Sequence, residues 1–257
     1  METAPRRLTF GAHADAYERA RPEWPEDAAR WLVPEGAELV VELGAGTGKL
    51  TRAVAGLGAR VVAVEPDPRM LAVLRGLGLE GVEGSAEAIP FGHGVADGVV
   101  AGSSLHWFDL GPALREIHRV LRPGGRFGFG WNHRDDRQPA IARLSETVYA
   151  AQARLRTPRW RNRDWAADLT ASGLFLDVER ELFEHVLELP RAALADHLMS
   201  YSGVAALPEP ERRRVLAEVG ELLDSDPSVS DAGTLRLPFV VAAYRATRAG
   251  RAGSPSP

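Results

Sequence analysis

The stretch Val40-Val41-Glu42-Leu43-Gly44-Ala45-Gly46-Thr47-Gly48 decides the fold class of this chain. An apolar run ends in an acidic residue, and glycines follow at alternate positions, which predicts a buried strand that turns tightly into a helix beside a ligand. A dinucleotide-binding turn would need a glycine at 49 or 51, and a phosphate-binding P-loop would need Ser or Thr after the lysine. The chain has Lys49, Leu50 and Thr51 instead. The turn therefore favours a nucleoside ligand.

Short apolar strands alternate with helical stretches after this turn. The expected strands are 38–43, 59–66, 81–84, 97–104 and 126–131. Because these strands are nearly continuous apolar runs, we expect helices on both faces of a parallel sheet. The alternation predicts a doubly wound α/β domain.

The second half of the chain has a different pattern. Helices are expected at 138–156, 162–172, 190–202 and 208–223, and strands at 178–189 and 235–247. The insertion at about 190–231 is interpreted as a helical cap over a binding site, with structural elaboration as the alternative. We expect a flexible N-terminus at 1–9, one domain at 10–247 and a disordered tail at 248–257.

Composition excludes several classes of protein and site. The chain has 257 residues, of which 45% are hydrophobic and 26% charged, with a net charge of −4 and no cysteine. Disulfides, thiolate metal sites and a cysteine nucleophile are therefore excluded, and the histidines show no ligand-like spacing, so no metal is expected. No secretory signal or membrane-length apolar run is present, so we expect a cytoplasmic protein without a membrane partner. The charge gives no reason to expect nucleic acid as a partner.

An acidic residue ends the second expected strand. Glu65 follows Glu42 by 23 residues, and a carboxylate there can accept hydrogen bonds from both hydroxyls of a ribose that lies across the glycine turn. The third strand leads into Ser85, Ala86 and Glu87, which we expect beside an adenine, although Glu87 fits a surface carboxylate as well. These positions predict an adenosine site.

Five motifs resemble, in order and spacing, those of class I S-adenosylmethionine-dependent methyltransferases. They are VVELGAGTGKLT, VVAVEPDPRML, EGSAEAIPF, DGVVAGSSLHWFD and REIHRVLRPGGRF, and the resemblance covers roughly residues 10–247. The pair SLHWFD (104–109) and GWNHRD (130–135), with Y-x-x-x-R-P-x-W-P at 17–25, is similar to a bacterial branch distantly related to trans-aconitate methyltransferases. The glycine motif is common to the superfamily, whereas this pair marks a branch and not a substrate.

The resemblance implies a fold and a cofactor. It implies a Rossmann-like sheet of seven strands, mostly parallel with one antiparallel strand near the edge, and a helical cap inserted before the last strand. It implies S-adenosylmethionine as cofactor, with S-adenosylhomocysteine as product. The cofactor-binding residues expected from it and from the spacing are Tyr17, Arg21, Glu42, Gly44, Ala45, Gly46, Glu65, Pro66, Met70, Ser85, Ala86, Glu87 and Ser103.

His106 follows the fourth strand, where class I enzymes bring the substrate to the methyl group. It is a candidate general base, and the alternative is a histidine bonded to the backbone beside Trp107. Tyr17 is a second catalytic candidate, because its ring and hydroxyl could close the pocket. The expected substrate-binding residues are His106, Trp107, Trp131, Asn132, Arg134 and Tyr201.

Aromatic side chains at 107, 131 and 201 favour an aromatic or indole-like secondary metabolite, methylated at carbon, nitrogen or oxygen. Two alternatives stay open: O-methylation of a small carboxylic acid such as aconitate, and a protein that binds the cofactor without catalysis. A monomer or a homodimer is expected.

Overall fold

The computed structural model describes residue 18 and residues 21–152, 163–231 and 233–250. One mixed sheet runs through the molecule in the order β3-β2-β1-β4-β5-β8-β6, and the two-residue strand β7 pairs with β8 outside this path. Its strands are β1 (Leu39–Leu43), β2 (Arg60–Glu65), β3 (Gly81–Glu83), β4 (Ala96–Gly102), β5 (Leu121–Arg134), β6 (Phe175–Pro190), β7 (Ser230–Asp231) and β8 (Thr234–Arg248). The first five are parallel, and β8 is antiparallel to both β5 and β6. The expected sheet is confirmed.

The described α-helices are α3 (Glu26–Leu32), α4 (Lys49–Ala55), α5 (Pro68–Gly76), α6 (Leu110–Val120), α7 (Pro139–Gln152), α8 (Trp165–Ser172), α9 (Leu194–Met199), α10 (Ser202–Ala205) and α11 (Glu209–Asp224). Two 3-10 turns, η2 (Leu105–Trp107) and η5 (Arg191–Ala193), precede α6 and α9. None of the helices in the described part of the chain is long and apolar enough to cross a membrane.

Apolar side chains alternate between the two faces of the sheet. Val99 and Ala101 of β4 belong to the cluster that packs against α6 and α8, whereas Val100 belongs to the cluster that packs against α3 and α4. Successive residues of a strand point to opposite faces, so a strand covered on both sides must be apolar throughout. This explains the continuous apolar runs in the sequence.

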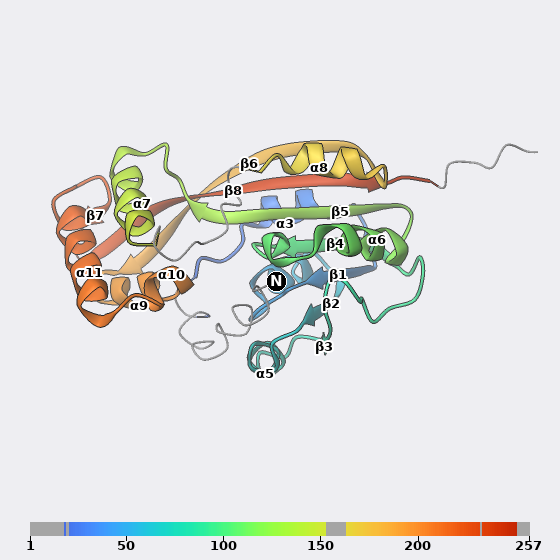
Figure 1. Cartoon of the computed structure of the whole chain (residues 1–257), viewed down its shortest axis with the longest axis horizontal. Coiled ribbons are helices and arrows are strands. Elements are labelled where there is room, and N and C mark those ends of the chain that lie inside the picture. The colour runs from blue at the N-terminus through green and yellow to red at the C-terminus, as the bar shows by residue number, and fades with distance from the viewer. Residues whose placement is uncertain (1–17, 19–20, 153–162, 232, 251–257) are drawn as a thin grey trace, which may run out of the picture.

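A third apolar cluster lies where β6 and β8 extend beyond the parallel strands. Leu235, Leu237 and Phe239 of β8 pack there against residues of α7, α9 and α11. Figure 1 shows these helices and α10 gathered at one end of the molecule, with β6 and β8 reaching toward them. The segment from η5 to α11, which lies between β6 and β8 in the sequence, therefore packs with α7 on a core of its own beside the parallel strands.

Several strands, among them β5, β6 and β8, run further than the sequence patterns predict. β5 begins at Leu121 because Ala96 pairs with Leu121 and Gly98 with Arg126, so residues 122–125 form an irregularity within the strand. β8 continues to Arg248, one residue past the expected end. The catalytic candidate Tyr17, the expected flexible residues 1–9, the end of the helix expected at 138–156 and most of the expected tail lie outside the described residues.

Candidate functional site

The glycine turn joins β1 to α4 in left-handed backbone conformations. Gly44 has φ 63° and Gly46 has φ 60°, a region that glycine enters without steric cost. A Cβ built on Gly44 would lie 2.8 Å from Ser104 Cβ, whereas one built on Gly46 would meet nothing within 4 Å. Gly44 is therefore required by packing against the end of β4, and Gly46 borders open space. Ala45, between them, is 9% exposed.

The Glu65 carboxylate connects this turn to the end of β2. Its Oε2 accepts a hydrogen bond of 2.8 Å from the Gly46 amide, and its Oε1 accepts one of 2.9 Å from the Asp67 amide. Burial raises the pKa of Glu65, and these two amides oppose the rise. Each carboxylate oxygen keeps a further acceptor site, so the group can still receive ligand hydroxyls.

Two other polar groups near the turn are buried without a hydrogen-bond partner among the described residues. They are Thr47 Oγ1 and Asp67 Oδ2. Buried polar atoms are nearly always satisfied in folded proteins, so these two atoms mark a place for a polar ligand. The sequence reasoning missed both residues, although Asp67 stands in the EPDP stretch and caps α5 by accepting from the Arg69 amide.

Glu42, at the end of β1, is 1% exposed and accepts a hydrogen bond from the Thr51 hydroxyl. Burial raises its pKa to about 8 against the effect of the Thr51 bond, and the negative charge of Glu65 adds to the rise. No Lys or Arg in the described residues forms an ion pair with it. Glu42 is thus a neutral acid at pH 7 that a ligand cation would ionise.

Five further predicted cofactor residues follow the ends of β2 and β3 in the chain. Met70 and Ala86 are buried, Pro66 is half-buried, and Ser85 forms an isolated bridge with Ala88. Glu87 accepts a hydrogen bond of 2.9 Å from the Asp109 amide, which ties the end of β3 to the start of α6. The expected adenine contact stays a prediction.

Ser103 is a non-glycine residue with φ 56°. Its amide donates to Gly130 O at 2.7 Å, and its hydroxyl accepts from the Asn132 amide at 3.3 Å. Such strained backbone is concentrated at functional sites. His106 lies three residues after Ser103, in the 3-10 turn η2 that follows β4.

His106 is held in one tautomer. The Trp131 indole Nε1–H donates a hydrogen bond of 3.1 Å to His106 Nδ1, so Nδ1 must carry a lone pair and Nε2 must carry the hydrogen. The imidazole packs on the Trp107 ring at 4.7 Å between centroids. Burial lowers the pKa of His106 to about 4. The ring is therefore a neutral group that presents an Nε2–H donor.

The predicted substrate residues occupy different environments. Trp107 is half-buried, but Trp131 is 2% exposed and packs among Phe129 and Trp165 in the core. The side-chain Nδ2 of Asn132 donates a hydrogen bond to Glu23 O at 2.9 Å, and its side-chain Oδ1 lies 2.8 Å from His185 Nε2. Because Trp131 is buried in the core, its link to the candidate site is the hydrogen bond that it donates to His106.

Arg21, Arg134 and Tyr201 come together from three distant parts of the chain. Arg21 Cζ lies 3.8 Å and Arg134 Cζ lies 4.7 Å from the centroid of the Tyr201 ring. Arg21 also donates to Ser200 O at 3.2 Å. The structure thus brings Arg21 to the helices between β6 and β8.

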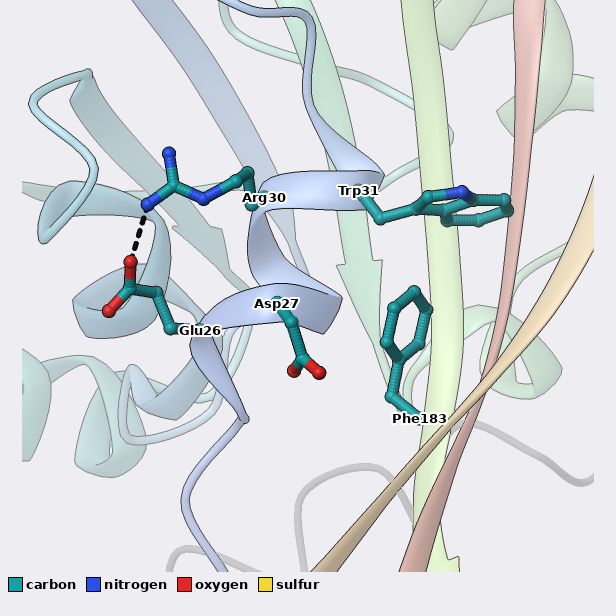
Figure 2. A pocket seen from close by; sticks show the side chains of 5 residues that line it. All are labelled: Glu26, Asp27, Arg30, Trp31 and Phe183. Carbon is teal, nitrogen blue, oxygen red and sulfur yellow. Dashed lines mark hydrogen bonds and ion pairs between the residues drawn. The ribbon is translucent and has the colours of Figure 1, made fainter.

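A separate groove of about 570 Å³ lies between α3 and β6 and is lined by Glu26, Asp27, Arg30, Trp31 and Phe183. Figure 2 shows the Glu26–Arg30 ion pair at one side of it and the Trp31 and Phe183 rings facing each other at the other. None of these residues was predicted to be functional. The described residues also contain no cluster of three His, Asp or Glu side chains that could hold a metal ion.

Comparison with known proteins gives the family. The methyltransferase domain family matches residues 41–129. An uncharacterized methyltransferase of Mycobacterium tuberculosis is 39% identical over 245 residues, which cover 94% of this chain and 96% of the relative. The chain belongs to the class I S-adenosylmethionine-dependent methyltransferases.

Other relatives agree with this assignment. The methyltransferase is 35% identical over 124 residues to the ubiquinone/menaquinone biosynthesis C-methyltransferase of Rubrivivax gelatinosus, covering 47% of this chain and 46% of that protein. Its fold matches a structure from Anaeromyxobacter dehalogenans, named as a type II methyltransferase, with a TM-score of 0.67, 25% identity and coverage of 89% of this chain and 97% of the other. These matches establish the enzyme class and leave the substrate open.

Proposed function

We propose that this methyltransferase binds S-adenosylmethionine at the glycine turn and transfers its methyl group to a small-molecule acceptor with an aromatic or indole-like body. The observation that carries the cofactor assignment is the glycine turn itself. Gly46 borders open space, and Glu65 joins the turn to β2. Thr47 Oγ1 and Asp67 Oδ2 are buried and have no hydrogen-bond partner in the residues that the structure describes. These groups fit a polar nucleoside that would satisfy them.

The cofactor supplies a methyl group on a sulfonium, which an electron-rich atom of the acceptor takes in an in-line displacement. The residues of the chain hold the reactants in position, which can lower such a barrier by about 7–11 kcal/mol. Gly44 and Gly46 let the backbone approach the nucleoside, Glu65 accepts hydroxyls, and Glu42 offers a carboxylate to a ligand cation. The chemistry therefore needs an acid–base residue of the protein only where the acceptor atom carries a proton that must be removed.

His106 is proposed to position the acceptor. With Nδ1 occupied by Trp131, the ring can donate a hydrogen bond from Nε2 but cannot take up a proton there without first changing tautomer. An acceptor atom with a lone pair, such as an oxygen, fits this donor. Two roles were expected for His106, substrate binding and general base catalysis. The hydrogen bond from Trp131 supports the first, in which His106 donates a hydrogen bond to the acceptor.

A specific observation also favours a carboxylic acid as substrate. Arg134 is 2% exposed, and its Nη1 has no hydrogen-bond partner in the described part of the chain. A buried guanidinium in this condition suits an acid, either as the methylated group or as a handle on a larger molecule. The predictions of a cytoplasmic location, a role in bacterial secondary metabolism, a monomer or homodimer and no nucleic-acid partner stay predictions.

Calorimetry tests the cofactor assignment. S-adenosylhomocysteine is expected to bind and NAD is not, because the turn lacks the features that bind a pyrophosphate. Glu65→Ala should weaken S-adenosylhomocysteine binding by about 1.5–3 kcal/mol, the range for a hydrogen bond to a charged group. Glu80→Ala is the matched control, because that carboxylate pairs with Arg60 on the surface. Tight NAD binding without a response to S-adenosylhomocysteine would refute the proposal.

Methyl transfer is tested separately from binding. Wild-type protein with labelled S-adenosylmethionine and fractions of a metabolite extract should give a labelled small molecule. Binding of S-adenosylhomocysteine without any labelled product across these fractions would support the alternative of a non-catalytic cofactor-binding protein.

A further inference from the structure

Two hydrogen-bond donors lie buried and unused where the end of β5 meets the residues after α9. Arg134 Nη1 and Tyr201 Oη are both buried, and neither has a hydrogen-bond partner in the part of the chain that the structure describes. The guanidinium carbon of Arg134 lies 4.7 Å from the centroid of the Tyr201 ring. The two donors therefore belong to one place in the molecule.

Within the part of the chain that the structure describes, no carboxylate forms an ion pair with Arg134. Its Nε donates to Ser145 Oγ at 2.9 Å, and that hydroxyl donates in turn to Asp136 Oδ1 at 2.6 Å. Asp135, the next residue in the chain, forms its ion pair with Arg137. Asp135 thus pairs with another arginine, and Asp136 is joined to Arg134 through the Ser145 hydroxyl. A buried cation without a counter-ion in contact with it is costly.

Arg21 adds a second positive group at the same ring. Its guanidinium carbon lies 3.8 Å from the Tyr201 centroid. The ring therefore stacks with guanidinium groups, which removes it as a simple apolar wall for a substrate and leaves its hydroxyl as the functional group. Positive groups and unused donors in one place call for a negatively charged acceptor.

We propose that Arg134 Nη1 and Tyr201 Oη bind a carboxylate group of the methyl acceptor. A carboxylate has two oxygens that can each accept a hydrogen bond from one of the two donors, and its negative charge balances the buried guanidinium of Arg134. The identification of this anion as substrate rests on the proposed function, whereas the anion site itself does not.

Tyr201→Phe is the sharpest test, because it removes only the hydroxyl. Since this hydroxyl has no partner among the residues that the structure describes, the variant without ligand should unfold at the same temperature as the wild type or higher. The probes are matched acids and amides: benzoate with benzamide, and indole-3-acetate with indole-3-acetamide. Calorimetry and thermal unfolding should show that the wild type prefers each acid to its amide, and that Tyr201→Phe loses about tenfold of the acid affinity.

Two further variants separate charge from shape. Arg134→Gln should also lose the preference for acids, whereas Tyr149→Phe should keep it. Tyr149 is the matched control because its ring lies 5.7 Å from the same guanidinium but is 40% exposed. Inorganic phosphate is a third probe and should bind more weakly than the carboxylates.

Any of four results would overturn the proposal: equal effects of acid and amide on the wild type for both pairs, full acid preference in Tyr201→Phe, phosphate binding as tight as carboxylate binding, or marked destabilisation of ligand-free Tyr201→Phe. S-adenosylhomocysteine binding is measured on the same samples. If it binds and the acids show no preference, this inference alone fails. If acids bind as expected and S-adenosylhomocysteine does not, the proposed function fails and the anion site stands.

Discussion

Binding of S-adenosylmethionine should release a proton from Glu42. This carboxyl group is 1% exposed, and burial raises its pKa to about 8, so the free protein holds it neutral at pH 7. It forms no ion pair with a Lys or Arg of the described residues. The ammonium group of the cofactor is a cation, and bound beside Glu42 it would pair with the carboxyl group and favour its charged form.

The size of the effect follows from the pKa. At pH 7 an acid with a pKa of about 8 is about 0.9 protonated, and an opposite charge nearby lowers a carboxyl pKa by about 1–3 units. With the cofactor bound, Glu42 is then about 0.5 protonated if its pKa falls by 1 unit, and nearly fully ionised if its pKa falls by about 3 units. Binding should therefore release about 0.4–0.9 protons from Glu42 at pH 7.

Calorimetry in phosphate and in Tris measures this number, because the difference in binding enthalpy between buffers scales with the protons exchanged. Glu42→Gln is the matched variant: its side chain has the same shape and can still accept from Thr51. 5′-Methylthioadenosine is the matched ligand, because it keeps the nucleoside and lacks the ammonium group. Equal proton release by the wild type and Glu42→Gln, with both binding S-adenosylhomocysteine, would refute the reasoning.

Stability gives a check on the same pKa. Because the folded pKa of about 8 exceeds the ordinary 4.5, the folded chain keeps a proton that the unfolded chain loses between these values. The contribution of Glu42 to stability is therefore complete below pH 4.5 and is lost as the pH rises through 8. Glu42→Gln should gain stability relative to the wild type as the pH rises over this range, in thermal unfolding without ligand.

Two further predictions concern His106 and the glycine turn. Because burial lowers the pKa of His106 to about 4, its ring stays neutral and the rate should show no inflection from it between about pH 5.5 and 8. His106→Ala should lower turnover about 10- to 100-fold and His106→Asn should recover most of it; an Asn variant as slow as Ala, with a rate that falls below about pH 6.5, would instead identify a general base. Gly46→Ala should lose about 1–2 kcal/mol of folding stability because of its positive φ, and it should lose cofactor binding. Gly36→Ala is the control: Gly36 has a similar φ of 67° and equally open space, so this variant should lose the same stability and bind the cofactor normally. Normal binding by Gly46→Ala would remove this residue from the site.

The glycine turn and its link to Glu65, which form the proposed adenosine half of the site, could be located from the sequence because their signals are local. The alternate glycines after β1 and Glu65 at the end of β2 are set by strand–turn–helix geometry, which repeats wherever parallel strands carry a ligand at their carboxyl ends. The continuous apolar runs likewise predicted a sheet covered on both faces, and β1, β2 and β4 are buried in that way. The order of the strands and their seven-membered path came from the family resemblance.

The roles of the substrate-side residues depended on contacts that no local pattern contains. The hydrogen bond from Trp131 to His106 joins residues 25 positions apart, and it turned an expected aromatic wall into the group that selects a histidine tautomer. Arg21 meets Tyr201 from about 180 positions away in the chain, because the extended ends of β6 and β8 bring the helices between them back to the start of the domain. A residue type in a sequence shows what a side chain can donate or accept, whereas burial and the neighbours that folding supplies determine which of those donors remain free for a ligand.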